Sequence, residues 1–245
     1  MFKAITSSLQ IKIIFAAIIV LGLPIGILVG NNTLDARKNL IEDETASEVA
    51  VIDGEVQAVS DSLALLEANT LFLANAPATE RYADYLAGAD DPEAQAFAED
   101  LYLAYLDNNT VPIYDIRVID TSGQEVLRVD DSEGGAPRVV RGAELENKAM
   151  QPWFLNSINL PSNQIYNSGF ALATTGDEYE VPYLPIIRFV VPLDSSSGER
   201  VGIIVMKIPM ATYFEQLTPD DAEETLTIID QTGEYVVHPD STALY

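Results

Sequence analysis

The hydrophobic pattern divides the chain into an apolar run, a heptad segment and a region with the period of β-strands. The apolar run covers residues 13–30, which are 18 residues without a charge. As a helix it would be about 27 Å long, close to the hydrocarbon thickness of a bilayer. A cleaved signal peptide is the alternative, but the run is longer than a usual signal-peptide core and no A-x-A-like site follows it. We therefore expect a transmembrane helix at residues 13–30.

The basic residues near this run predict its orientation. Lys3 and Lys12 precede the run, and no acidic residue accompanies them. By the positive-inside rule, residues 1–12 are expected in the cytoplasm. Residues 31–245 are then expected in the periplasm or outside the cell, anchored to the inner (plasma) membrane by a single pass.

Residues 31–75 carry a heptad pattern that is typical of helices packing side by side. Spacings of three and four alternate until Thr70 interrupts them, and the apolar positions are Val49, Ile52, Val56, Val59, Leu63, Leu66 and Leu73. This pattern predicts a homodimer through residues 49–73. An amphipathic helix docked on its own domain is the alternative.

Residues 76–210 predict an α+β domain. Short helices are expected in residues 76–109, where prolines stand near the helix starts. From residue 113 the period changes to that of strands, and Asp120 and Gly123 are expected to form a tight turn between the first two. The full set of expected elements is strands at 113–119, 125–129, 164–172, 186–193 and 201–208, with a helix at 142–158. This order predicts an antiparallel sheet flanked by helices, beside the long N-terminal helix.

An internal repeat indicates a second unit of the same kind. The hairpin sequence of residues 116–126 recurs at residues 225–236, with the Asp and Gly of its turn in register. Residues 211–224 would form a connecting helix, and residues 225–245 the first hairpin of the second unit. Because a lone hairpin is marginally stable in water, we expect this sequence to be the front part of a longer protein.

Composition and charge limit the function. The chain has 38 acidic and 13 basic residues, a formal net charge of −25, and no cysteine. A surface of this charge repels nucleic acid and anionic lipid, so no nucleic-acid binding is expected. The lack of cysteine excludes disulfides and thiolate metal sites, and it is compatible with an extracytoplasmic bacterial domain that folds by core packing alone.

Motifs for catalysis and cofactor binding are missing from the sequence. It contains no G-x-S-x-G, no G-x-x-x-x-G-K-[ST] and no G-x-G-x-x-G. His238 is the only histidine, and exposure at a loop end explains it better than a metal site with Asp230 and Asp240. We expect no catalytic residue, no metal site and no cofactor in this chain.

Five segments together resemble a known family of sensors. They are residues 116–129 (IRVIDTSGQEVLRV), 144–154 (ELENKAMQPWF), 164–168 (QIYNS), 182–192 (PYLPIIRFVVP) and 201–208 (VGIIVMKI). They are similar to the double Cache, or tandem PAS-like, extracytoplasmic domains of bacterial histidine kinases, chemoreceptors and diguanylate cyclases. The resemblance implies a membrane-distal sensor domain at residues 76–210 and a membrane-proximal one that starts at residue 225. It also implies a second transmembrane helix that leads to a cytoplasmic output module.

The resemblance has one departure that concerns the ligand. In this family an arginine often precedes the aromatic pair and helps to hold a ligand carboxylate. Residues 149–152 of this chain read Ala-Met-Gln-Pro instead. This difference weakens the expectation of amino-acid or carboxylate binding.

A ligand pocket in such a fold would lie between the sheet and the helices that cover it. The candidates for its wall are Trp153, Tyr166, Asn167, Tyr183, Arg188 and Phe189, with Arg117 and Arg128 on the preceding hairpin. Aromatic faces form a shaped apolar wall, and arginine offers a planar set of donors to carboxylate or phosphate. The aromatic residues could equally belong to the core, and Arg117 and Arg128 could form local ion pairs. Arg188 stands among Ile and Phe residues and needs a partner, either a ligand or a protein carboxylate.

These patterns predict the extracytoplasmic sensing region of a transmembrane signal-transduction receptor. It would bind a small molecule in the distal pocket and relay binding through the long helix. Two alternatives remain open at this point. One is a protein-recognition module whose pocket is filled by its own side chains, and the other is a structural, membrane-anchored dimeriser without a ligand.

Overall fold

The computed structural model describes residues 23–131, 136–175, 178–181, 183–216, 227–229, 233 and 235–237. The predicted cytoplasmic segment, most of the predicted transmembrane run and His238 lie outside these residues. Within the described part of the chain, none of the helices combines the length and apolar character that crossing a membrane requires. The chain divides into two compact units, Met1–Glu55 and Val56–Tyr245, and the sheet belongs to the second.

The helices follow the predicted order. They are α2 (Leu23–Ala74), α3 (Pro77–Leu86), α4 (Ala94–Asn108), α5 (Pro152–Ser157) and α6 (Ala211–Gln216). The long helix ends at Ala74, one residue from the predicted boundary, and the two short helices after it are confirmed. Proline occurs in the first turn of α3 and of α5, where its missing N–H would have no partner within the helix in any case.

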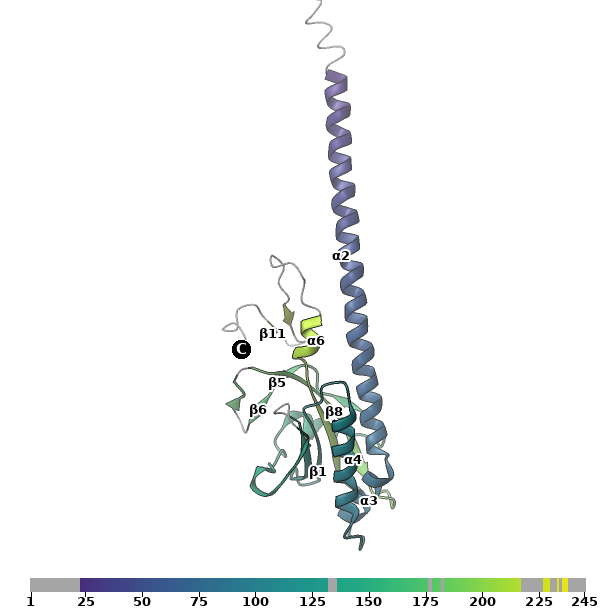
Figure 1. Ribbon diagram of the computed structural model, residues 1–245, viewed down its shortest axis with the longest axis vertical. Coiled ribbons are helices and arrows are strands. Elements are labelled where there is room, and N and C mark those ends of the chain that lie inside the picture. The colour runs from purple at the N-terminus through teal and green to yellow at the C-terminus, as the bar shows by residue number, and fades with distance from the viewer. Residues whose placement is uncertain are drawn as a thin grey trace, which may run out of the picture. The chain divides into compact units, whose positions relative to one another are not determined.

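The strands form one antiparallel sheet in the order β3-β2-β1-β9-β8-β4, with β5 also paired to β8. Their bounds are β1 (Asp115–Asp120), β2 (Glu125–Asp130), β3 (Arg138–Val140), β4 (Tyr166–Asn167), β5 (Ala171–Leu172), β8 (Pro185–Asp194) and β9 (Arg200–Pro209). Two short ladders pair β6 (Thr174–Thr175) with β7 (Glu178–Tyr179), and β10 (Ile228–Ile229) with β11 (Tyr235–Val237). The α+β class with helices flanking an antiparallel sheet is confirmed (Figure 1).

The helix predicted at residues 142–158 is wrong over most of its length. Only a 3₁₀ turn at Gly142–Glu144 and helix α5 are helical. The residues between them use their backbone to pair with the turn after β1 instead. The N–H of Glu125 bonds to the carbonyl of Glu146 at 3.0 Å, and the N–H of Lys148 bonds to that of Gly123 at 2.6 Å. The strand predicted at 164–172 is likewise broken into β4 and β5.

The predicted turn between β1 and β2 is confirmed. The carboxylate of Asp120 accepts hydrogen bonds from the N–H groups of Ser122 and Gln124, at 2.8 and 3.0 Å. Gly123 has φ +83°, and a Cβ there would overlap the backbone of Ala149 at 2.4 Å. A residue with a side chain would therefore displace the segment that leads to α5.

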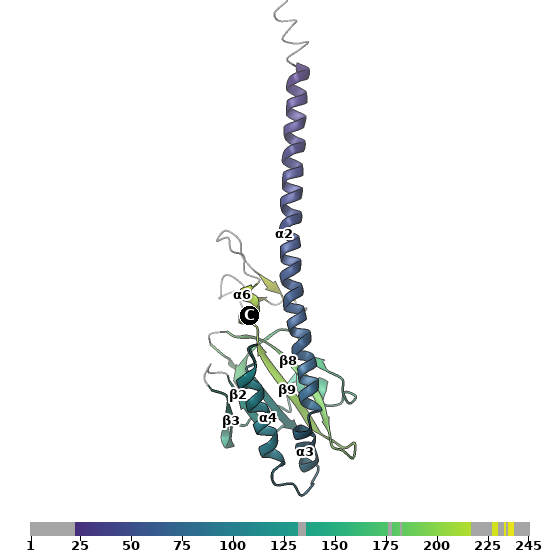
Figure 2. The ribbon, with the colours of Figure 1, turned by 45° about the vertical axis from the view of Figure 1, so that its right-hand side comes forward.

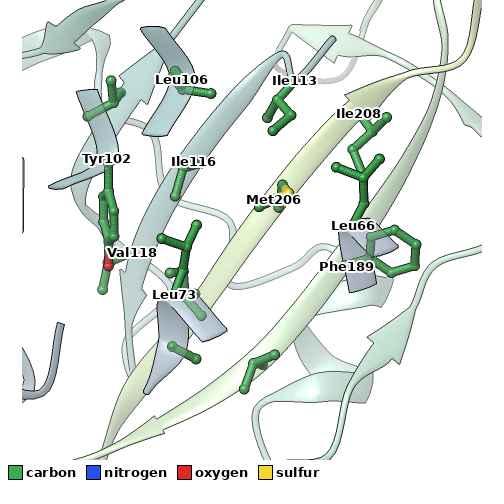
Figure 3. Close-up of a cluster of buried hydrophobic side chains, with 14 of the residues drawn as sticks. Leu66, Leu73, Tyr102, Leu106, Ile113, Ile116, Val118, Phe189, Met206 and Ile208 are labelled. Carbon is green, nitrogen blue, oxygen red and sulfur yellow. The ribbon is translucent and has the colours of Figure 1, made fainter. Parts of the chain in front are cut away.

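One face of the sheet carries the main core. Alternate residues of β1, β8 and β9 point to this face, which α3, α4 and the C-terminal part of α2 cover. Figure 2 shows α4 in front of β2 and β9. Figure 3 shows Leu66 and Leu73 of α2 among Val118, Met206 and Phe189, and both leucines are fully buried.

The heptad seam of α2 has two parts. Val59, Leu66 and Leu73 are buried against the sheet of their own domain, so self-docking describes the second part. Val49 and Ile52, earlier in the seam, are at least half exposed. The homodimer through residues 49–73 stays a prediction.

Candidate functional site

The second face of the sheet forms the floor of a cavity of about 410 Å³. This volume lies within the range of small-molecule sites, about 300–1,000 Å³. The wall consists of Tyr114, Asp115, Arg117, Arg128, Asp130, Arg138, Glu146, Lys148, Gln151, Trp153, Thr174, Glu180, Val181, Arg188 and Lys207. Six of these side chains are cationic and four are carboxylates, and two further carboxylates, Glu125 and Glu144, form ion pairs with arginines of the wall.

Strand alternation places the charged side chains in this cavity. Arg117 on β1 lies between Ile116 and Val118, which face the helix side. In the same way, Arg188 on β8 and Lys207 on β9 lie between core residues and point to the opposite face. A smaller apolar cluster around Trp153 and Phe154 of α5 covers the rest of this face.

Arg117 is the centre of a buried ion-pair network. Its guanidinium bonds to both carboxylate oxygens of Asp115, with the Nε–Oδ1 contact at 2.7 Å, and to Oε1 of Glu125 at 2.5 Å. All three side chains are almost fully buried. Burial alone would raise the pKa of Asp115, but Arg117 holds that pKa below its usual value. The network therefore keeps Asp115 ionised, with both carboxylate oxygens bonded to Arg117.

Arg128 and Arg138 extend this network along β2 and β3. Arg128 contacts Glu125 at 3.3 Å and Asp130 at 3.2 Å, and Arg138 contacts Glu144 at 2.9 Å. The Nε atom of Arg128 is buried and has no hydrogen-bond partner in the described structure. Each carboxylate of the network thus has an arginine partner, whereas one arginine donor, Nε of Arg128, has no acceptor among the described residues.

Arg188 differs from these arginines because its guanidinium makes no hydrogen bond or ion pair with any described residue. Its head group lies 5.3 Å from the centre of the Trp153 ring, which is a cation–π contact. The side chain keeps part of its surface open towards the cavity. Burial of the head group, followed by the nearby Arg117, lowers the pKa of Arg188 to about 10, so it remains charged at neutral pH.

Lys207 is the second cation with weak compensation. Its ammonium lies 4.0 Å from the centre of the Tyr114 ring and 3.7 Å from Oε1 of Glu180. The side chain is almost fully buried. Burial lowers the pKa of Lys207 to about 8, although Asp115 and Glu180 act in the opposite direction. Lys207 is therefore close to losing its proton in mildly alkaline solution.

The structure brings together half of the residues predicted for the wall. Arg117, Arg128, Trp153 and Arg188 line the cavity. Tyr166 lines an adjoining hollow of about 340 Å³, which shares Trp153 and Arg188 with the first.

Three predicted wall residues lie elsewhere. Phe189 is in the core on the helix side, because the residue after Arg188 must point to the opposite face. Tyr183 is 40% exposed, and its ring packs edge-to-face on that of Tyr179 at 6.4 Å. Asn167 is exposed, and its side-chain Oδ1 accepts a hydrogen bond from the N–H of Gly169 at 2.9 Å.

The sequence analysis missed Lys207 and the carboxylates of the cavity. The signal for Lys207 was present, since it is a lone charge in the apolar strand at residues 201–208. Asp115 and Arg117 are two residues apart on one strand and therefore share a face. Residues Lys148 and Gln151 line the cavity in the segment where the family arginine is missing. Among the described residues, no cluster of three or more His, Cys, Asp or Glu side chains could hold a metal ion.

Solved structures with the same fold are sensor domains. A domain of a protein assigned to the sensory box/GGDEF family of Vibrio parahaemolyticus matches at 21% identity and a TM-score of 0.65, covering 78% of this chain and 70% of that one. The extracellular domain of a protein assigned as the histidine kinase vpHK1S-Z8 matches at 20% identity and a TM-score of 0.64, covering 78% and 66%. The ligand-binding domain of the Campylobacter jejuni chemoreceptor Tlp3, in complex with L-valine, matches at 15% identity and a TM-score of 0.56, covering 84% and 75%.

These matches confirm the Cache-like, PAS-like fold that the sequence resembled. The sequence match is more specific. The family described as "Bacterial histidine kinase, sensor domain" matches residues 66–245. The chain belongs to this family. No curated protein matches the sequence at a significant level.

Proposed function

We propose that this chain is the extracytoplasmic ligand-sensing region of a transmembrane receptor and that its ligand binds in the cavity beside Arg188. Residues 31–245 would lie in the periplasm or outside the cell. Any kinase or cyclase activity would belong to another part of the receptor. The relay would pass from the sheet to α2, within a dimer that α2 helps to form.

The observation that carries this proposal is the guanidinium of Arg188, which has no hydrogen-bond or ion-pair partner among the described residues. An isolated buried charge costs several kcal/mol unless a partner compensates it, and such groups mark functional sites. Here the guanidinium lines a cavity of about 410 Å³ and forms no ion pair with a carboxylate among the described residues. A ligand would supply the missing partner.

The free volume beside Arg188 and Tyr166 favours a ligand over the two alternatives. A protein-recognition module would have this space filled by its own side chains, and a structural dimeriser would need neither the space nor the charges. The chemoreceptor Tlp3, which has the same fold, has been crystallised with L-valine and with isoleucine. That fold is therefore able to hold a small molecule.

Trp153 provides a direct test, because it is the only tryptophan of the chain and lines the cavity. The full chain in detergent would be titrated with amino acids, carboxylates, amines and nucleotides while the Trp153 emission is recorded. A saturable change in emission with a matching rise in melting temperature is expected for at least one class. Trp153→Phe is the control, since it should remove the signal and keep the fold.

The opposite outcome is also clear. If no class of metabolite changes the emission or the melting temperature, small-molecule sensing through this cavity is refuted. Protein recognition would then be the better hypothesis.

A further inference from the structure

Five charged residues form one straight row across the sheet. In strand order they are Arg138, Asp130, Asp115, Lys207 and Arg188, each directly opposite the next in the register of the ladder. Adjacent strands are about 4.8 Å apart, so each side chain has its neighbours close at hand. In this row, the two neighbouring carboxylates, Asp130 and Asp115, are followed by two neighbouring cations, Lys207 and Arg188.

The carboxylate half of the row is fully compensated. Asp115 binds Arg117 through both oxygens, and Asp130 contacts Arg128 and Arg138. The repulsion between the two opposed carboxylates is thus offset by three arginines.

The cationic half is not compensated to the same degree. Lys207 and Arg188 are directly opposite each other on β9 and β8, and like charges in this position destabilise a sheet. Lys207 has one ion pair, at 3.7 Å to Glu180, and that carboxylate also accepts the hydroxyl of Tyr114 at 3.2 Å. Among the described residues, the guanidinium of Arg188 contacts the ring of Trp153 and forms no ion pair, although the charges of Asp115 and Glu180 lie close enough to act on it.

Among the described groups of the cavity wall, two charged donors lack a hydrogen-bond partner. They are the guanidinium of Arg188 and the buried Nε of Arg128. Each carboxylate of the described wall already has a cationic partner: Asp115 has Arg117, Asp130 has Arg128 and Arg138, Glu146 has Lys148, and Glu180 has Lys207. A ligand ammonium would find no described carboxylate without a partner, whereas a ligand anion would meet two cations.

We infer that the ligand is a small dianion, a dicarboxylate or a phosphate, whose negative group bridges Lys207 and Arg188. Two negative charges would match the two cations, Lys207 and Arg188, that lie directly opposite each other in the sheet. Arginine and lysine are the usual donors to carboxylate and phosphate oxygens, and arginine binds them through two parallel N–H groups. This inference rests on the proposed sensing function and names the chemical class of its ligand.

An anion between Lys207 on β9 and Arg188 on β8 would change the energy of contact between these two strands. The anion would contact a side chain from each of the two paired strands and would offset the repulsion between their two cations. A sheet in which Lys207 and Arg188 lie close together would then bind the ligand more tightly than one in which they are apart. Signalling depends on such a difference, because a ligand shifts an equilibrium between two conformations only by its differential affinity for them.

The test uses the full chain in detergent at pH 7 and four probes: succinate, inorganic phosphate, L-valine and putrescine. Succinate or phosphate should change the Trp153 emission in a saturable way and raise the melting temperature, and these two arms separate the dicarboxylate from the phosphate source. Arg188→Gln and Lys207→Gln should each weaken that binding about tenfold or more, since each removes one charged contact. Arg81→Gln is the matched control, because Arg81 is a partly exposed arginine on α3 outside the cavity.

Arg188→Lys keeps the positive charge. It is the control that tests whether Arg188→Gln loses binding through loss of the charge or through loss of the fold. It should retain part of the affinity that Arg188→Gln loses. Binding of L-valine or putrescine without binding of either dianion would overturn the inference and leave the sensing function intact. Dianion binding that survives in both glutamine variants would overturn the bridging site. A lack of binding by every probe and by the wider metabolite panel would refute the sensing function as well.

Discussion

The hydroxyl of Thr70 on α2 lies 3.5 Å from the sulfur of Met206 on β9, and it donates a hydrogen bond to the carbonyl of Leu66 at 2.8 Å. Lys207, the next residue of β9, faces the cavity on the other side of the sheet. Successive residues of a strand point to opposite faces, so one short stretch of β9 contacts both the cavity and the long helix. We propose this stretch as the route by which ligand binding reaches α2.

Docking of α2 on the sheet should depend on one face of the helix. Leu66→Ala is expected to lower the free energy of unfolding by about 2–5 kcal/mol, because it leaves a cavity in the core. Leu65→Ala should change it by less than about 0.5 kcal/mol, since Leu65 is 56% exposed. Urea denaturation of the two variants measures the difference. Equal effects would contradict the docking of this part of α2.

Removal of the unpaired cation should stabilise the protein without ligand. Arg188→Met keeps much of the apolar stem and removes a charge that has no ion-pair partner among the described residues, so the unfolding free energy should rise by about 1 kcal/mol or more. Arg117→Met should instead lower it by about 3–5 kcal/mol, because Asp115 and Glu125 would lose their main partner. Thermal unfolding distinguishes the two variants. A loss of stability in both would mean that Arg188 has a structural partner.

Lys207 should make stability depend on pH. Its pKa is lowered from 10.5 to about 8 in the folded state, so between these values the unfolded state binds more protons than the folded one. The free energy of unfolding should therefore rise with pH across this window, by on the order of 2 kcal/mol between pH 8 and 10. Burial is the main cause that lowers this pKa, and Arg117 and Arg188 lower it further, whereas Asp115 and Glu180 raise it.

The measurement is a series of urea unfolding curves between pH 7 and 10. Lys207→Met is the control, because it has no proton to lose and should show a smaller rise over the same range. An identical pH profile in the variant and the unmodified chain would rule out Lys207 as the titrating group.

The close approach of β1 and β9 should make Gly202 irreplaceable. A Cβ at this position would lie 2.1 Å from the carbonyl oxygen of Ile119, so Gly202→Ala forces the two central strands apart. We expect a loss of about 2 kcal/mol or more of unfolding free energy, as for other overpacked cores. Gly54→Ala is the comparison, since a Cβ there meets nothing within 4 Å and alanine favours a helix. Denaturation curves that show a similar loss for both would refute the steric explanation.

The sequence by itself determined most elements of the fold and its family. The heptad pattern predicted α2, and the nearly continuous apolar runs at residues 186–193 and 201–208 predicted β8 and β9, because these patterns report burial along a regular backbone. The turn at Asp120 and Gly123 was predicted for a similar reason, since its chemistry is local. The helix at 142–158 was not predicted correctly, because its residues pair with a turn that is distant in sequence.

Only the tertiary structure decided the site. The sequence singled out Arg188 as a cation in an apolar strand, but it did not show that Lys207 lies directly opposite on β9. It also did not show that Asp115 and Glu125 are both bound by Arg117, which leaves Arg188 without an ion pair among the described residues. Which charges compensate each other depends on the register between strands and on distances of a few ångströms. These quantities arise from packing, and a one-dimensional pattern of residue types does not contain them.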